Sequence, residues 1–416
     1  MCPQVSCSPW YLRRSFLFII AIFFAVVAAW SRLPFVMQVA TAIADVFMRL
    51  LRLVSVPILF FSVVSVFSSL DGQAHAGKVT RLITRYTILT TLCASCVALL
   101  FVHLFSLTSH TGPIAAQAVT TEVNQFNYAE WVLDVVPSNI VRPFADNNAI
   151  AALLVALLLG YSASKLPEEQ KVRVHHLFSS LYSLLMQTTL FIVRFVPIIL
   201  WAFLTILFGQ ISDMKAFGDI IRFFVAVLAA NLVQGLIILP LFLKLKRIEP
   251  WKLMKAFSPA LSMAFATKSS SATAPMAIDC AVNRAGLSKN IASISFPLCT
   301  SINMNGCAAF ILTTVIFVGS GEGVVFSGLD QFLWIFIATI AAIGNAGVPM
   351  GCYFLSCALL SSMNVPLYLM GAILPLYGII DAVETALNVW SDSSVTAVVD
   401  KEMSLYKIEQ ERILAE

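Results

Sequence analysis

Five polar residues near the carboxyl end share one face of a predicted helix. The stretch DAVETALNVWSD places them at relative positions 0, 3, 4, 7 and 11, which align as one stripe on an α-helix: Asp381, Glu384, Thr385, Asn388 and Asp392. The fifty residues before this stretch contain no Asp, Glu, Lys or Arg. An ionised carboxylate at the centre of a bilayer costs roughly 2.5 kcal/mol or more. The stripe therefore predicts a bound ion, a proton or a cationic ligand group, unless Asp392 lies at the interface and the other two acids are protonated.

A second polar motif, NMNG, occupies residues 303–306. On a regular helix, residues two positions apart point to nearly opposite sides, and here two asparagines are followed by a glycine. This pattern predicts an unwound turn with free backbone carbonyls. Such carbonyls supply the oxygen ligands that sodium binds in transporters. A polar contact between two helices is the alternative.

Three consecutive serines, at 269–271, lie in the stretch KSSSATAP. Hydroxyl groups and free backbone N–H groups at the start of a helix suit a carboxylate ligand. Serines are also common in tight turns for local reasons. The cluster is therefore a candidate carboxylate site or an ordinary turn.

Composition indicates that these motifs lie in a membrane protein. Hydrophobic residues make up 59% of 416 positions and charged residues only 12%, whereas a soluble domain has about 25% charged residues. The net charge of +4 is spread along the chain, which excludes the basic patch of a nucleic-acid-binding protein. Cys93 and Cys96 form a C-x-x-C within an apolar run, which is typical of packing residues. No motif predicts an organic cofactor.

Hydropathy predicts eight membrane-spanning segments and an all-α fold. They cover residues 15–30, 43–70, 86–107, 149–163, 172–208, 217–245, 291–318 and 366–399, with a polar loop at 108–148. Lysines and arginines gather on alternate flanks, and none occurs from 87 to 141. By the positive-inside rule both termini are predicted to be cytoplasmic. The chain has no N-x-Ser/Thr site, which is compatible with a bacterial inner membrane.

Two further apolar stretches are interrupted at their centres. Residues 253–281 contain KSSSATAP and residues 332–360 contain GNAGVP, so that each half is too short to cross a bilayer. Paired, interrupted segments of this kind point to the binding site of a transporter. They predict two re-entrant helical hairpins, with kinked helices as the alternative.

In these motifs the chain resembles the dicarboxylate/amino acid:cation symporters, which include the glutamate transporters. DVFMRLLRLVSVPILFFSVV resembles the second helix of that family, KSSSATAP its first hairpin tip, NMNGCA its NMDGTA signature, AGVP its second hairpin and DAVETALNVWSD its last helix. The resemblance implies a homotrimer that works as an elevator. Residues 1–75 and 111–212 would form the scaffold, 76–110 and 213–400 the transport domain, and 401–416 a cytoplasmic tail.

The resemblance also implies two sets of ligands. The amino-acid substrate would contact Ser270, Cys307, Gly347, Val348, Asp381, Glu384, Thr385 and Asn388. Sodium, or a proton in its place, would be the coupling ion, and the sodium ligands would come from Thr90, Thr91, Cys299, Ser301, Asn303, Asn305, Ala342, Ile343, Asn345, Asn388 and Asp392. A third sodium site would use Thr90, Thr91, Asn303 and Asn305, and it is in doubt because Asn305 replaces a charged aspartate of the family pattern. Cys307 replaces a threonine of that pattern.

Glu384 is the departure that bears on the substrate. Family members with acidic substrates carry an arginine at this position, which forms a bidentate contact with the substrate carboxylate. Two like charges at 4 Å cost about 4 kcal/mol even at an effective dielectric constant of 20. The sequence therefore predicts a cation-coupled symporter for a neutral or cationic amino acid, and not an enzyme. An acidic amino acid or dicarboxylate symporter and a substrate-gated channel are the alternatives.

Overall fold

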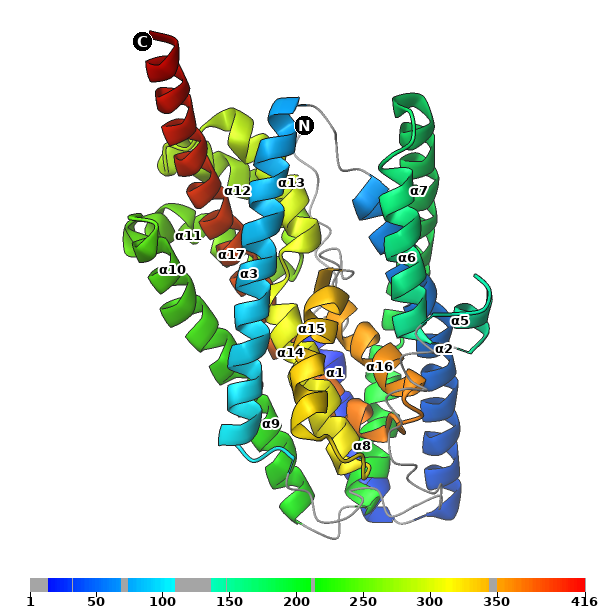
Figure 1. The fold of residues 1–416 in the computed structure, drawn as a ribbon. Helices are drawn as coiled ribbons and strands as arrows, with labels where there is room; N and C mark the ends of the chain where they lie inside the picture. Colours follow the sequence, from blue (N-terminus) through cyan, green and yellow to red (C-terminus); the bar gives the residue numbers. More distant parts are fainter. Residues whose placement is uncertain are drawn as a thin grey trace, which may run out of the picture.

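The structure, a computed structural model, describes residues 14–31, 33–68, 74–108, 136–146, 148–210, 214–343 and 350–415. Within these ranges every regular element is a helix, and none is a strand (Figure 1). The prediction of an all-α chain is confirmed for the part that the structure describes.

One group of helices is built around the long helix α2 (Pro34–Ser68). It packs against α6 (Ala149–Ala163), α7 (Glu168–Val193) and α8 (Val196–Gln210), and α8 in turn packs against α1 (Arg14–Ser31). The predicted single segment 172–208 is wrong in one respect, because α7 and α8 are separate helices. Pro197 explains the break: it has no N–H for the carbonyl of Val193, and its ring clashes with that carbonyl.

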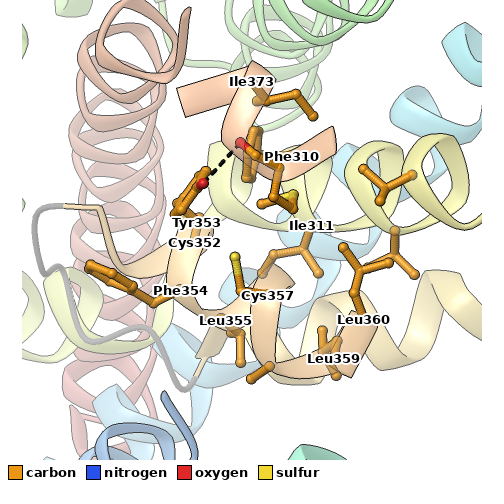
Figure 2. Close-up of a cluster of buried hydrophobic side chains, with 14 of the residues drawn as sticks. Phe310, Ile311, Cys352, Tyr353, Phe354, Leu355, Cys357, Leu359, Leu360 and Ile373 are labelled. Carbon is orange, nitrogen blue, oxygen red and sulfur yellow. Dashed lines mark hydrogen bonds between the residues drawn. The ribbon is translucent and has the colours of Figure 1, made fainter. Parts of the chain in front are cut away.

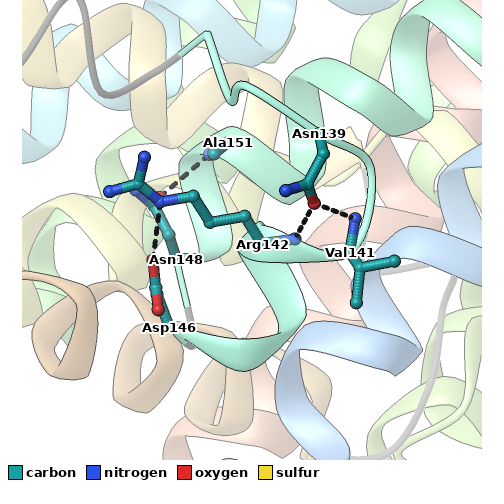
Figure 3. A network of polar contacts seen from close by, with 6 residues as sticks. All are labelled: Asn139, Val141, Arg142, Asp146, Asn148 and Ala151. Atoms are coloured by element: carbon teal, nitrogen blue, oxygen red, sulfur yellow. Dashed lines mark hydrogen bonds and ion pairs between the residues drawn. The ribbon is translucent and has the colours of Figure 1, made fainter.

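The end of the predicted polar loop lies beside this group. The short helix α5 (Arg142–Ala145) is preceded by Asn139, whose side-chain oxygen accepts hydrogen bonds from the N–H groups of Val141 and Arg142 (Figure 3). Asn148 caps α6 by accepting a hydrogen bond from the N–H of Ala151. These side-chain caps satisfy backbone donors that helix starts leave free.

A second group contains α3 (Ala74–Leu104), α9 (Met214–Val233) and α10 (Leu239–Leu245). A single π-helical turn, η2 (Gln234–Ile238), joins α9 to α10. Such turns are frequent at functional sites. Here the turn places the buried Gln234 against α3, where its amide donates a hydrogen bond to the carbonyl of Thr90 at 3.0 Å.

Both interrupted stretches are pairs of shorter helices. In the first, α11 (Pro250–Thr267) packs against α12 (Ser270–Asp279), which continues into the π-helical turn η3 (Cys280–Arg284). Lys268 makes the turn between them with a left-handed φ of 54°. In the second, α15 (Gly328–Ile343) and α16 (Gly351–Ser362) both pack against α14 (Asn305–Gly321). The interruption itself, at 344–349, lies outside the described residues.

The last helix, α17 (Tyr368–Ala415), is continuous over 48 residues and packs against α11, α13 (Lys289–Ile302) and α14. The predicted span 366–399 therefore continues without a break into the predicted tail. The sequence after Pro375 contains Gly378 as its only glycine and no further proline, so nothing in it stops the helix. Helix α17 also packs on α8 and thus joins the two groups.

Four helical stretches of the described chain are long and apolar enough to cross a bilayer: Lys78–Leu104, Gly218–Leu245, Lys289–Gly321 and Tyr368–Tyr406. The apolar window of the third is entirely buried within the protein.

Helix α16 packs between α14 and α2. There the Tyr353 hydroxyl donates a hydrogen bond of 2.9 Å to the carbonyl of Met370, amid buried side chains of α14 and α16 (Figure 2).

Candidate functional site

The NMNG segment is a break between two helices. Helix α13 ends at Ile302 and α14 begins at Asn305, while Asn303 and Met304 have non-helical ψ angles of 75° and 63°. The predicted unwound turn is confirmed. Because both asparagines are fully buried, their side chains must find partners inside the protein.

The two asparagine amides are held by helices α3 and α17. Asn303 donates to Ser391 Oγ at 3.0 Å and to Asp392 Oδ1 at 2.9 Å. Asn305 donates to the same serine at 2.9 Å. Thr90 and Thr91 of α3 donate from the other side, to the oxygens of Asn303 at 3.3 Å and Asn305 at 2.9 Å. The polar helix contact and the unwound turn, considered as alternatives, are both present.

Asp392 is fully buried and only half satisfied. Its Oδ1 accepts the Asn303 hydrogen bond, whereas Oδ2 has no partner among the described residues. None of the ion pairs found in the described chain involves this carboxylate. A buried, unpartnered carboxylate oxygen is costly unless a cation or a proton accompanies it. Oxygen ligands of this type fit sodium, so the residues around Asp392 can hold a small hard cation.

The other predicted sodium ligands do not all lie around Asp392 in the part of the chain that the structure describes. The carbonyl of Cys299 accepts a 2.7 Å hydrogen bond from the N–H of Asn303, and the hydroxyl of Ser301 donates to the carbonyl of Pro297 within α13. Ala342 and Ile343 form the end of α15. Asn345 lies outside the described residues. The structure thus brings the threonines, both asparagines and Asp392 together. It does not describe the full set of the remaining predicted ligands, because Asn345 is not among the described residues.

The polar stripe of α17 faces the protein interior. Its five members are between 0% and 6% exposed: Asp381, Glu384, Thr385, Asn388 and Asp392. Tyr377 donates to Asp381 Oδ1 at 3.5 Å, and the Thr385 hydroxyl donates to the Asp381 carbonyl one turn earlier in the helix. Asn388 accepts a 2.8 Å hydrogen bond from the N–H of Gly306, which fixes α17 against the start of α14.

Glu384 is 1% exposed, and neither of its carboxylate oxygens has a hydrogen-bond partner in the described chain. Helix α14 approaches α17 closely here: a Cβ added to Gly306 would lie 2.8 Å from the Glu384 Cα. None of the ion pairs of the described chain joins Lys268 to Glu384. The Lys268 ammonium instead reaches α17 near Gly378, 3.4 Å from where a Cβ on that glycine would lie.

The serine cluster sits at the start of α12. Ser269 is the N-cap, and its Oγ accepts a 3.2 Å hydrogen bond from the N–H of Ala272. Ser270 follows as the first helical residue and is buried. Ser269 therefore has the local turn role that was the alternative to a carboxylate site. Ser270 lies at a buried helix start, where a carboxylate could bind. Gly347 and Val348 lie outside the described residues.

Cys307 and Cys352 complete the surroundings of Glu384. The two sulfur atoms and a Glu384 carboxylate oxygen all lie within 4.8 Å of one another. The Asn388 amide donates to the Cys307 sulfur at 3.3 Å. The approach of Cys352 was not predicted from the sequence, because residues on α16 and α17 are brought together only by tertiary packing.

Sequence reasoning also missed Ser391 and Gln234. Ser391 joins both asparagines, yet it lies between members of the stripe and adjoins a run of further serines that bond within their own helix. Gln234 depends on the π-helical turn, which places its side chain toward α3. An isolated glutamine in an apolar run was the available signal.

Comparison with known proteins agrees with these features. A model of the sodium:dicarboxylate symporter family matches residues 15–402. An L-cystine uptake protein of Bacillus cereus is 26% identical over 393 residues, which cover 89% of this chain and 82% of the relative. A neutral amino acid transporter B(0) of mouse is 25% identical over 402 residues, covering 84% and 72%. A symporter of Haemophilus influenzae is 27% identical over 373 residues, covering 83% and 82%. The chain therefore belongs to the sodium:dicarboxylate symporter family, a family of membrane transporters rather than enzymes.

Proposed function

We propose that this chain is a sodium-coupled symporter that imports a neutral or cationic amino acid. The observation that carries the substrate class is Glu384, a buried carboxylate with no partner of its own in the described chain. It follows Asp381 by one helical turn on the same inward face. Two carboxylates in one buried region, neither of them in an ion pair of the described chain, favour a ligand that brings positive charge, because each would otherwise be destabilised by burial and by the other.

The contacts around these acids support specific roles. Asp381 would bind the substrate α-amino group, and Asn388 with the backbone near Ser270 its α-carboxylate, since Ser270 begins a helix whose free N–H groups suit an anion. Glu384 would face the substrate side chain, along with Cys307 and Thr385. Gly347 and Val348 would close the site.

The named substrates of the relatives are consistent with this class. Cystine has no net charge and carries a second ammonium group at its far end, which Glu384 could neutralise. A neutral amino acid would instead be accompanied by a proton on Glu384. A glutamate or aspartate side chain would meet a like charge at this position.

The proposed ion ligands and substrate ligands lie on the same segments of the chain, which would couple ion binding to substrate binding. Asn303 binds Asp392, and Gly306, in the same NMNG segment, binds Asn388. An ion that orders this segment also orders a substrate ligand, and by linkage the substrate raises ion affinity by the same factor. We propose that sodium is the ion, held by Asp392 with carbonyls near Cys299, Asn303 and Asn388. Further sodium would bind near Ser301 and the end of α15, and near the threonines of α3.

The two helix groups support an assignment of one to a scaffold and the other to a transport domain. We propose that α1, α2 and α6–α8 form a stationary scaffold in a homotrimer, while α3 and α9–α17 carry the substrate in an elevator motion with α11–α12 and α15–α16 as re-entrant hairpins. Both termini would be cytoplasmic, in a bacterial inner membrane. Within the described chain, exposed apolar side chains on α1 and α2 are consistent with contact to lipid or to neighbouring subunits: Ile22, Phe23, Phe24, Phe35, Val46 and Leu53.

The test is uptake into liposomes that contain the purified protein. Labelled arginine, lysine, cystine, alanine and glutamate would be offered under an imposed sodium gradient, an imposed proton gradient or none. We expect saturable, sodium-dependent uptake of neutral or cationic substrates and little of glutamate. Unsaturable flux would indicate a channel instead.

Glu384→Gln then isolates the carboxylate. A charge-assisted contact contributes about 1.5–3 kcal/mol, so the substitution should lower uptake efficiency for cationic substrates by roughly 10- to 100-fold and that for neutral ones less. Glu169→Gln is the matched control, because Glu169 lies on the surface of α7 in an exposed pair with Arg173. Strong glutamate uptake that is lost in Glu384→Gln would refute the proposed substrate class.

A further inference from the structure

Three possible metal ligands from different helices lie close together in the buried interior. Cys307 lies in the first turn of α14, Cys352 in the first turn of α16, and Glu384 on α17. Their two sulfur atoms and one carboxylate oxygen lie within 4.8 Å of one another, and all three residues are at most 3% exposed. Two thiols and a carboxylate at such a distance form a set that a single metal ion can bridge after small side-chain rotations.

Glu384 supplies a second, independent observation. Neither of its carboxylate oxygens has a charged partner or a hydrogen bond of ordinary geometry in the described chain, although the residue is 1% exposed; its polar neighbours are the Cys352 thiol and the Tyr377 hydroxyl. Buried carboxylates are normally paired, hydrogen-bonded or bound to a metal. The unpartnered carboxylate thus points to a positively charged ligand at this place, and the neighbouring thiols restrict which ligand that is.

The donor atoms select a thiol-seeking cation. Thiolate sulfur favours zinc and related metals, whereas sodium and magnesium favour oxygen. Zinc commonly has three protein ligands and an open fourth position when its site is not purely structural. Asn388 adds an outer contact, because its amide donates to the Cys307 sulfur at 3.3 Å while its oxygen is held by Gly306. Outer hydrogen bonds of this kind orient ligands and tune metal affinity.

We propose that Cys307, Cys352 and Glu384 form a binding site for a thiol-seeking divalent cation, Zn²⁺ or Cd²⁺, whose occupancy stops transport. Binding replaces the two S–H bonds by metal–sulfur bonds and releases both thiol protons to solvent. The bound ion would tie α16 to α14 and α17 and would occupy the place of the substrate side chain. This inhibitory effect rests on the proposed function, whereas the metal site itself does not.

Cadmium titration of the purified full-length protein tests the site directly. Cadmium–thiolate bonds absorb in the ultraviolet by charge transfer, so bound metal can be counted against cysteine ligands. We expect Cys307→Ser/Cys352→Ser to lose one bound Cd²⁺ per chain with its thiolate absorption. We expect Glu384→Gln to weaken binding by more than the roughly 10- to 100-fold that is typical for loss of an outer partner.

The matched control is Cys93→Ser/Cys96→Ser, which removes two cysteines from one helix, α3, that are not among the three proposed ligands. This control should keep the cadmium site that Cys307→Ser/Cys352→Ser loses. Each variant is first checked for the elution volume and thermal unfolding of a folded protein. If Cys307→Ser/Cys352→Ser misfolds, the single variants Cys307→Ser and Cys352→Ser decide the question, since each should remove half of the thiolate absorption of this site. Unchanged cadmium stoichiometry and absorption in folded variants would overturn the proposal.

A transport measurement separates the site from the proposed function. Micromolar Zn²⁺ should inhibit uptake by the wild-type protein and by the α3 control, and a chelator should restore it. Residual uptake by the Cys307→Ser/Cys352→Ser variant should not respond to Zn²⁺. If the wild-type protein transports no amino acid at all, the proposed function fails, while the cadmium titration still decides whether the metal site exists.

Discussion

The side-chain amide of Asn303 lies 2.9 Å from Asp392 Oδ1 and donates a hydrogen bond to it. This contact connects the unwound segment between α13 and α14 to the last helix, and it leaves Asp392 Oδ2 without a partner in the described chain. The hydrogen bond to Oδ1 orients the carboxylate, and Oδ2 can bind a cation. A small cation that binds Oδ2 would hold both segments at once, which is the physical basis of the coupling proposed above.

Asp392→Asn should abolish stabilisation by sodium. The substitution keeps the shape of the side chain but removes the charge that a cation would neutralise. A ligand present at 100 times its dissociation constant stabilises the folded state by about 2.7 kcal/mol. We expect the wild-type Tm to rise with sodium concentration relative to choline, and the Asp392→Asn Tm to stay constant.

Asp279→Asn is the control for that measurement, because Asp279 is exposed on α12 and bonds only to Asn283 among the contacts of the described chain. It should respond to sodium as the wild-type protein does. Equal sodium responses of Asp392→Asn and the wild-type protein would show that the ion binds elsewhere.

Gly306→Ala should destabilise the protein through a backbone clash. The added Cβ would lie 2.8 Å from the Glu384 Cα and 3.0 Å from its Cβ, so α14 and α17 would have to separate. Overpacking of this kind costs about 1–3 kcal/mol. Gly218→Ala in α9 is a matched control with no atom within 4 Å of its added Cβ, and it should stabilise the helix by about 0.5–1 kcal/mol. Thermal unfolding of both variants measures the difference in sign.

Ser391→Ala should cost more than the neighbouring Ser393→Ala. Ser391 Oγ accepts hydrogen bonds from the amides of Asn303 and Asn305, and its loss would leave these buried donors short of partners, at about 1–3 kcal/mol. The Ser393 hydroxyl bonds only to the carbonyl of Val389 in its own helix, among the contacts described. Both serines are fully buried, so the comparison isolates the bridging role. Similar unfolding temperatures for the two variants would contradict it.

The sequence predicted those features that depend on local pattern. The inward stripe of α17 follows from spacing alone, since any helix through Asp381 and Asp392 places them on one side. The unwound turn at Asn303 followed from two asparagines two positions apart and the glycine after them. The break before α8 also has a local cause, Pro197. It was not predicted, because hydropathy merged the two helices into one segment.

Contacts between helices could not be predicted in this way. Cys352 reaches Glu384 only because α16 and α17 both pack on α14, and hydropathy treats all three as uniform apolar runs. The close approach of Gly306 to Glu384 likewise depends on the path of two helices. Residue type therefore predicted that an acid would need a partner, while the tertiary structure decides which groups lie near it.

Glu322 provides a prediction about pH outside the membrane-spanning helices. It follows α14 directly, is partly buried and has one carboxylate oxygen without a partner in the described chain. Burial raises the pKa of Glu322 from its ordinary value of 4.5 to about 7. The folded protein thus holds this proton to a higher pH than the unfolded chain does. The resulting stabilisation is complete below pH 4.5 and is lost as the pH rises to about 7.

Glu322→Gln should remove this dependence, because glutamine stays neutral at every pH. We expect the Tm of the variant to exceed that of the wild-type protein by more at about pH 8 than at about pH 5, where the wild-type carboxyl is largely protonated in the folded state. Glu169→Gln, at an exposed position on α7, serves as the control and should show no such pH-dependent gap. A Tm difference between Glu322→Gln and wild type that is the same at both pH values would mean that Glu322 is hydrated and ionises normally. It would then contribute nothing to the pH dependence of stability.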